Sequence, residues 1–91
     1  MEIEWDEAKA EENLRRRGID FDTAVDVLSD PRKIERLDNR FNYGEDRIQV
    51  IGRAGGRILF VVYTLRSNRY RIISVRRANR HERAAYHTLH G

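Results

Sequence analysis

A continuous apolar run in the second half of the chain, Ile58-Leu59-Phe60-Val61-Val62-Tyr63, restricts the fold more than any other segment. The run has the length of a strand, and a strand without polar alternation is typical of the buried centre of a sheet. Gly55-Gly56 before it and Ser67-Asn68 after it are pairs that favour tight turns. The sequence therefore predicts a central strand that is joined by short turns to a neighbour on each side.

Three further segments carry strand patterns around this run. In residues 47–52, Ile48 and Val50 point to one face of a strand and Gln49 and Ile51 to the other. Residues 70–77 include the apolar residues Ile72, Ile73 and Val75. Residues 33–37 form a weaker pattern that suits the edge of a sheet. Consecutive strands with short connections usually pair with each other, so we expect a four-stranded antiparallel sheet.

Two helices are predicted before the strands. Asp6 is a typical N-cap residue and Gly18 a typical C-cap, which places the first helix between them. A second, shorter helix should begin at Asp20 or Asp22, because an apolar stripe with helical spacing follows. The residues of that stripe are Phe21, Ala24, Val25 and Leu28.

A last helix follows the strands. Asn79 and Glu82 have the spacing of a capping box, and the helix should run to about Leu89. The order of elements predicts an α+β fold with two N-terminal helices, a four-stranded antiparallel sheet and a C-terminal helix. A chain of 91 residues has room for one domain, which we expect to span residues 1–91.

Composition excludes several classes of protein. The chain contains no cysteine, which removes disulfides, thiolate metal sites and a cysteine nucleophile. No apolar stretch approaches the roughly 18 residues of a membrane span, and the acidic start Met1-Glu2-Ile3-Glu4-Trp5 lacks the basic segment of a signal peptide. We therefore expect a cytoplasmic protein without a membrane partner.

Charge divides the chain into two unlike halves. Residues 1–46 contain 8 Lys+Arg and 14 Asp+Glu, whereas residues 47–91 contain 10 arginines, no lysine and a single acid, Glu82. Arginine stays charged at any relevant pH, and its planar guanidinium suits phosphate. The basic half therefore indicates a polyanion ligand, with RNA or DNA as the first candidate. The plainer alternative is that these arginines solubilise the sheet and pair with acids of the first half.

The densest group of candidate site residues spans the end of the last strand and the start of the last helix. A helix N-terminus offers free N–H groups to an anion, and arginines beside it reinforce such a site. Adjacent Arg76 and Arg77 should point to opposite faces of a regular strand, so both serve one site only where the strand ends or twists. The face expected for Arg76 carries Tyr70, Ile72 and Ser74. The candidates for phosphate contact are Arg76, Arg77, Arg80 and Arg83.

Several other residues have two interpretations each. His81 neighbours the arginines and suits acid–base catalysis, but an exposed, solvated histidine is the plainer interpretation. Tyr86 can stack on a base or transfer a proton, or it anchors the last helix. Lys9 can touch phosphate or remain a surface residue. His87 and His90 have no third ligand nearby, so we expect neither a metal nor a cofactor.

A series of short segments along the chain is distinctive when its order and spacing are taken together: Trp5-Asp6-Glu7-Ala8-Lys9, Asn13-Leu14, Gly18-Ile19, Phe21, Asp30-Pro31, Gly44-Glu45-Asp46-Arg47, Ile51-Gly52, Leu59-Phe60-Val61-Val62-Tyr63-Thr64 and Arg71-Ile72-Ile73-Ser74-Val75-Arg76-Arg77-Ala78. The series resembles the BrnT family of bacterial toxins and covers residues 3–86. The chain departs from the pattern at Val75, where alanine or methionine is expected, and at His81, where a basic or polar residue is common.

The resemblance implies a RelE-like fold and a ribonuclease toxin of a type II toxin–antitoxin pair, which cleaves RNA and stops translation. Such nucleases are metal-free: the ribose 2′-OH attacks the adjacent phosphate, and cationic side chains stabilise the transition state. The implied partners are RNA, either free or on the ribosome, and a BrnA-type antitoxin with a ribbon-helix-helix domain. Operator DNA is bound only through that antitoxin. His81 and Tyr86 are alternatives for the general base. The resemblance implies that Arg76 and Arg77 stabilise the transition state, and that Arg80, Arg83 and Arg47 are further contacts to RNA. Our own interpretation of the residues adds His81 as a catalytic candidate beside Arg76, Arg77 and Arg80. It also adds Tyr86 and Lys9 as RNA-binding candidates beside Arg47 and Arg83.

A second hypothesis involves no catalysis. The same basic surface would serve a nucleic-acid-binding or partner-docking module, because contacts to phosphate are independent of sequence. Against it, no segment looks like a recognition helix, and the aromatic residues are sparse for base stacking. A loss of cleavage with little loss of RNA affinity in Arg76→Ala separates the two hypotheses.

Overall fold

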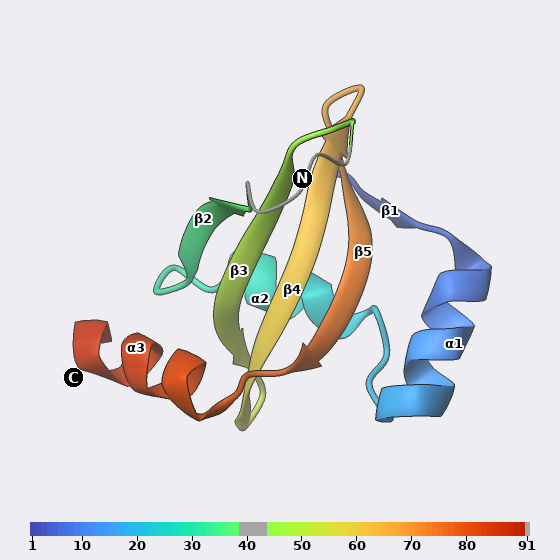
Figure 1. Ribbon diagram of the computed structural model, residues 1–91. Coiled ribbons are helices and arrows are strands. Elements are labelled where there is room, and N and C mark those ends of the chain that lie inside the picture. Colours follow the sequence, from blue (N-terminus) through green and yellow to red (C-terminus); the bar gives the residue numbers. More distant parts are fainter. Residues whose placement is uncertain (39–43, 91) are drawn as a thin grey trace.

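Five strands form one mixed sheet, and three helices lie against it in the computed structural model, which describes residues 1–38 and 44–90 (Figure 1). The strand order across the sheet is β1-β5-β4-β3-β2. The strands are β1 (Ile3–Trp5), β2 (Ile34–Asp38), β3 (Arg47–Ala54), β4 (Arg57–Arg66) and β5 (Arg69–Arg77), and the helices are α1 (Glu7–Arg17), α2 (Thr23–Ser29) and α3 (Arg80–His90). The α+β class, the three helices, the central position of β4 and the edge position of β2 are confirmed.

The expected four-stranded antiparallel sheet is wrong in one respect. Ile3–Trp5 forms a fifth strand that pairs in parallel with β5, in register Ile3↔Tyr70 to Trp5↔Ile72. The pairing is extended by a hydrogen bond from the Tyr70 N–H to the Glu2 carbonyl, 2.9 Å. Three residues are too few to show a strand period, and their partner lies far along the chain. Local sequence pattern therefore does not reveal this strand.

A β-bulge in β5 corrects the expected face of Arg76. Ser74 pairs with Val62 and Ile72 pairs with Tyr63, so Ile73 is an extra residue opposite that step. Side chains alternate along a regular strand, and one extra residue reverses the alternation. Arg76 therefore shares its face with Ser74, as expected, but not with Tyr70 and Ile72, which belong to the core on the other face.

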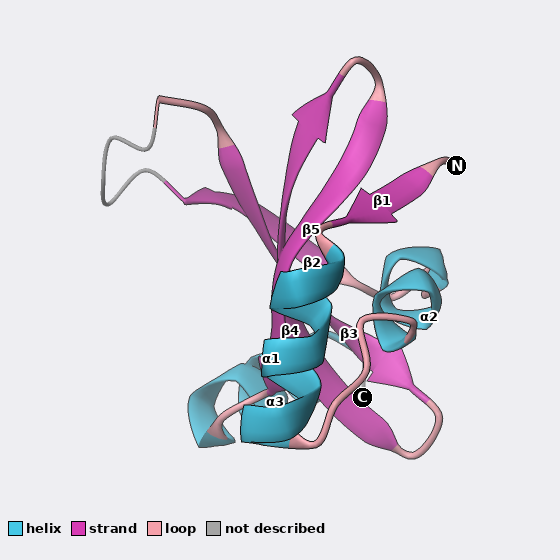
Figure 2. Ribbon diagram, turned by 90° about the vertical axis from the view of Figure 1, so that its right-hand side faces the viewer, coloured by secondary structure: helices cyan, strands magenta, loops and turns pink. Residues whose placement is uncertain are grey.

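The main core lies between one face of the sheet and helices α1 and α2. Figure 2 shows α2 and α3 on opposite sides of the sheet. The stripe expected for α2 is confirmed at Phe21, Ala24 and Leu28, but Val25 is 40% exposed and Val27 is fully buried in its place. Close approach of α2 to β3 depends on Gly52, where a Cβ atom would lie 2.9 Å from Cγ1 of Val27.

Local signals set the ends of the helices and turns. The Asp6 carboxylate accepts hydrogen bonds from the N–H groups of Ala8 and Lys9, and Gly18 ends α1 with φ of 68°. Of the two expected caps for α2, Asp22 holds the N-cap position, although its side chain makes no capping bond. Ser67 and Asn68 both have positive φ, as a tight hairpin turn requires. Along the described residues, no helix is long and apolar enough to cross a membrane.

Asn13 of α1 closes the edge of β5 beyond the end of β1. Its Nδ2 donates to the carbonyls of Val75, 2.9 Å, and Ile19, 3.0 Å, and its Oδ1 accepts from the Val75 N–H, 3.4 Å. The side-chain amide thus satisfies backbone groups that a neighbouring strand would otherwise pair. Because Asn13 is 8% exposed, water does not replace these bonds readily.

We expect Asn13→Leu to lower the free energy of unfolding by about 2 kcal/mol or more, because buried backbone groups of Val75 and Ile19 lose their partners. Urea unfolding followed by circular dichroism measures the change. Glu11→Gln, on the exposed side of the same helix, should stay within about 0.5 kcal/mol of the wild type. Equal stability of Asn13→Leu and the wild type would contradict this account of the edge.

Candidate functional site

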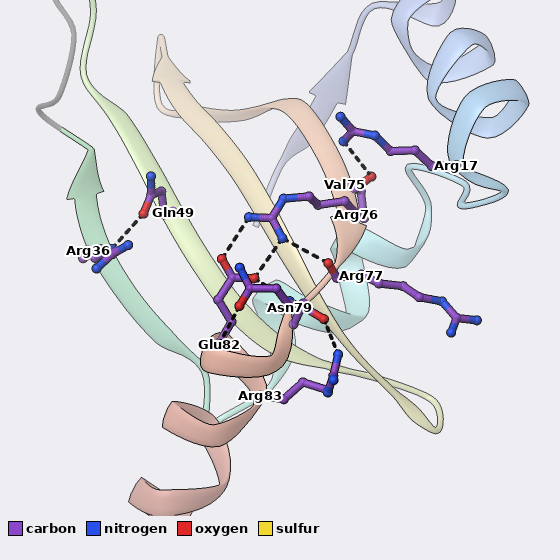
Figure 3. A network of polar contacts seen from close by, with 10 residues as sticks. Arg17, Arg36, Gln49, Val75, Arg76, Arg77, Asn79, Glu82 and Arg83 are labelled. Carbon is purple, nitrogen blue, oxygen red and sulfur yellow. Dashed lines mark hydrogen bonds and ion pairs between the residues drawn. The ribbon is translucent and has the colours of Figure 1, made fainter.

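Arg76 occupies a fixed position on the face of the sheet opposite α2. Its Nη1 and Nη2 donate to Oε1 and Oε2 of Glu82 at 2.8 and 2.9 Å, and Nη1 also donates to the Arg77 carbonyl at 3.0 Å (Figure 3). The guanidinium lies 3.9 Å from the centre of the Phe60 ring. These three bonds hold Arg76 in place. They do not use all the N–H groups of the guanidinium, so Arg76 keeps donors for a ligand.

Glu82 has two structural roles. Its Oε1 accepts from the Asn79 N–H at 2.8 Å while its own N–H donates to Asn79 Oδ1 at 2.9 Å, which confirms the predicted capping box at the start of α3. Burial raises the pKa of Glu82, but the hydrogen bonds from Arg76 and Asn79 outweigh burial, and the pKa lies below its ordinary value. One ionised carboxylate therefore begins α3 and orients Arg76.

A cleft of about 220 Å³ adjoins this ion pair, and we call it the Arg76 cleft. Phe60 and Glu82, the two partners of Arg76, both line it, together with His81. Its other lining residues are Ile34, Arg36, Gln49, Ile51 and Ala85. The lining of the cleft combines apolar side chains with cationic and hydrogen-bonding groups, which suits a phosphodiester with its attached base.

Arg36 is a site residue that sequence patterns did not predict. Its Nε donates to Gln49 Oε1 at 2.7 Å, and its charge helps to lower the pKa of Glu82. The register of the sheet brings Arg36 there. Ile34, Ile51, Phe60 and Arg76 form one cross-strand row, and Arg36 lies two residues after Ile34, on the same face of β2. No local signal marks Arg36, and only the pairing of β2 with β3 places it beside the site.

The structure separates Arg77 from Arg76. The two side chains leave β5 in different directions, and Figure 3 shows Arg77 pointing away from Glu82. Arg83 lies near Arg77 rather than Arg76, and its Nη1 donates to the Ala78 carbonyl at 2.6 Å. Arg80 is exposed at the first position of α3. Of the four predicted arginines, Arg77 and Arg83 therefore lie together, and both are separated from Arg76.

The two candidate general bases differ in exposure. His81 is exposed and lines the Arg76 cleft. Tyr86 is 3% exposed, packs with Ile58 and Ala78, and donates its hydroxyl to Asp30 Oδ2 at 2.7 Å. This placement suits an anchor for α3 better than a side chain that stacks on RNA.

Lys9 and Arg47 lie outside the Arg76 cleft. Lys9 lines a separate hollow of about 210 Å³ between α1 and β5, together with Arg16 and Arg17. Arg47 begins β3 on the same face as Arg76, beside Asp38 in the sheet register. In the described parts of the chain, no three His, Asp or Glu side chains are grouped closely enough to hold a metal ion.

Asp30 links α3 to the rest of the fold and should make stability depend on pH. Burial raises its pKa, but hydrogen bonds from Tyr86 and from the N–H groups of Arg32 and Arg53 outweigh burial, so the pKa is lowered. A carboxylate with a lowered folded-state pKa stabilises the fold above its unfolded pKa of about 3.9, and this contribution disappears as pH falls through the folded value.

We therefore expect Tyr86→Phe to be less stable than the wild type at neutral pH. The two should converge as pH falls below the unfolded pKa of about 3.9 and through the lower folded-state pKa of Asp30. Urea unfolding at a series of pH values gives the difference directly. Asp30→Asn should lose most of the same pH dependence. A Tyr86→Phe deficit that stays constant across the series would show that the hydroxyl does not act through ionised Asp30.

Comparison with models of known protein families identifies one family that covers most of the chain. The family model described as "Ribonuclease toxin, BrnT, of type II toxin-antitoxin system" matches residues 5–82. That span includes the Arg76–Glu82 pair, the strands that carry it and the first turn of α3. A search of curated proteins found no match.

Proposed function

The chain belongs to the BrnT family of ribonuclease toxins of type II toxin–antitoxin systems, and from this premise we propose that Arg76 is the centre of a metal-free endoribonuclease. The observation that carries the proposal is the fixed guanidinium of Arg76, which keeps N–H donors while Glu82 and Phe60 hold it. Donors positioned in advance stabilise charge that develops during a reaction without reorganising, which is the main source of catalytic power in such sites.

The proposed reaction is an internal phosphoryl transfer of the kind that RelE-like nucleases perform. The ribose 2′-oxygen forms a bond to the adjacent phosphorus, and the bond from phosphorus to the 5′-oxygen of the next nucleotide breaks. A base removes the proton of the 2′-OH, and the leaving 5′-oxygen takes up a proton. One product carries a 2′,3′-cyclic phosphate and the other a 5′-hydroxyl, and the proposed reaction needs no metal ion.

Within this reaction Arg76 would donate to the non-bridging phosphate oxygens, where negative charge accumulates. His81 is the better placed of the two candidate bases, because it is exposed at the Arg76 cleft whereas Tyr86 is buried against Asp30. Arg80, at the exposed start of α3, is assigned a supporting contact to phosphate. Lys9 and Arg47 are assigned to parts of the RNA outside the cleft.

We propose that cleavage stops translation in the cytoplasm, on RNA that is either free or bound to the ribosome. The proposed partner is a BrnA-type antitoxin with a ribbon-helix-helix domain, which covers the basic surface and connects the toxin to operator DNA. Binding to the folded state alone raises the melting temperature by linkage. A complex that melts no higher than the free toxin would argue against this partner.

Incubation of the purified chain with end-labelled RNA in EDTA tests the proposed function. We expect cleavage without added metal and fragments that end in a 2′,3′-cyclic phosphate. If free RNA stays intact, the same incubation with translating ribosomes decides whether the ribosome is required. Intact RNA in both experiments would contradict the assignment of a nuclease centre to Arg76.

A further inference from the structure

A second hollow lies on the other side of α3 from the Arg76 cleft. It has a volume of about 460 Å³ and is bounded by the β3–β4 hairpin, the end of β5 and α3. Its charged lining consists of Arg53, Arg57, Arg77 and Arg83, and His87 also lines it. No carboxylate of the described residues is among its lining residues. We call this hollow the hairpin groove.

The arginines of the hairpin groove differ in their partners from four other arginines of β4 and β5. Arg66, Arg69, Arg71 and Arg76 each form an ion pair with a glutamate at 3.3 Å or less. No arginine of the groove forms an ion pair with a carboxylate in the described parts of the chain, although Arg53 is near enough to help lower the pKa of Asp30. The groove therefore concentrates positive charge that the fold does not neutralise.

The walls of the groove are held in place by bonds that do not use its charge. The Ala78 N–H donates to the Ile58 carbonyl at 3.0 Å, which ties the end of β5 to β4. One Nη of Arg83, a lining residue of the groove, donates to the Ala78 carbonyl, and this bond helps to fix the guanidinium. The Tyr86–Asp30 bond anchors α3 against the other wall. A ligand therefore meets a groove whose walls are fixed and in which the guanidinium of Arg83 is already positioned.

We propose that the hairpin groove binds backbone phosphates of the RNA strand away from the cleaved linkage. The inference rests on the proposed function, because it takes RNA as the substrate. A strand with its reacting phosphate at Arg76 would reach the groove across the start of α3, since Arg77 follows Arg76 in the chain, lines the groove and points away from Glu82 (Figure 3). Guanidinium groups bind phosphate through paired hydrogen bonds, which favours a phosphate chain over scattered carboxylates.

The test compares long single-stranded RNA with a dinucleotide that spans only the cleaved linkage. The variant is Arg53→Ala/Arg57→Ala, and the matched control is Arg66→Ala/Arg69→Ala, which removes the same charge from the β4–β5 turn. For the groove variant we expect the Kd for long RNA to rise roughly tenfold and the salt slope to fall by about 0.7 for each phosphate that the protein no longer binds. Its dinucleotide cleavage should match the wild type, and the control should change neither quantity.

Three results would overturn the proposal. The first is an unchanged affinity for long RNA in the groove variant, and the second is an equal loss of RNA affinity in the control. The third is a loss of affinity for the antitoxin alone, which would make the groove a site for an acidic protein segment. If the wild type cleaves neither substrate, and RNA on translating ribosomes also stays intact, the proposed function fails, whereas the Kd for long RNA still decides the role of the groove.

Discussion

Replacement of Arg76 by alanine should lower the rate constant of RNA cleavage by about 100- to 1000-fold, because a positioned donor to the transition state is lost. The affinity for RNA should fall much less, since Arg76 is one cation among many on this surface. Single-turnover cleavage and filter binding on the same RNA measure the two quantities. Parallel loss of both would favour a binding role for Arg76 and, with it, the non-catalytic hypothesis.

Two variants make the Arg76 experiment specific. Arg71→Ala removes an arginine from the same face of β5 that is also paired with a glutamate, Glu4, and it should change the rate little. Arg76→Lys keeps the charge but loses the planar fork, so it should restore only part of the rate. Because Arg76→Ala leaves Glu82 half-buried without its cation, thermal unfolding must show that the variant is folded at the assay temperature.

Glu82→Gln should lower the rate constant while it tightens RNA binding. The amide removes a negative charge from the RNA side of the cleft, which strengthens attraction to phosphate. It also breaks the two-bond pairing with Arg76, so the guanidinium loses its fixed orientation. A lower kcat with a lower KM is the signature of this combination.

The opposite outcome has an equally clear meaning. A kcat that rises in Glu82→Gln would show that the carboxylate mainly blocks Arg76 from substrate. The pH dependence of the cleavage rate separates a positioning role of Glu82 from a role as general base. If Glu82 only positions Arg76, the rate of Glu82→Gln should still fall at acidic pH as it does in the wild type. If that fall disappears in Glu82→Gln, Glu82 is the base. His81→Ala, from the same cleft, provides the comparison.

Those parts of the fold that depend on neighbouring residues were predictable from the sequence. Asp6, Gly18 and the Asn79–Glu82 pair mark helix ends through bonds within a few residues, and the apolar run of β4 shows its burial directly. Strand β1 and the bulge at Ile73 were not predictable, because both exist only through pairing with a distant segment. The bulge also decides which residues share a face with Arg76.

The candidate site divides in the same way. Charge patterning pointed to the arginines at the junction of β5 and α3, and strand alternation already indicated that Arg76 and Arg77 would diverge. The ion pair between Arg76 and Glu82 was not predicted, because the capping box had given Glu82 a sufficient role. Arg36 and the hairpin arginines Arg53 and Arg57 become site residues only through the sheet register and the position of α3, which no local pattern encodes.

The most direct test of the central claim uses an RNA in which a single 2′-OH is replaced by hydrogen at the nucleotide before a mapped cleavage site. If Arg76 stabilises attack by the ribose oxygen, that linkage should become resistant while neighbouring sites are still cut, and wild-type products elsewhere should end in a cyclic phosphate. Cleavage of the deoxy linkage at the unmodified rate would contradict the mechanism.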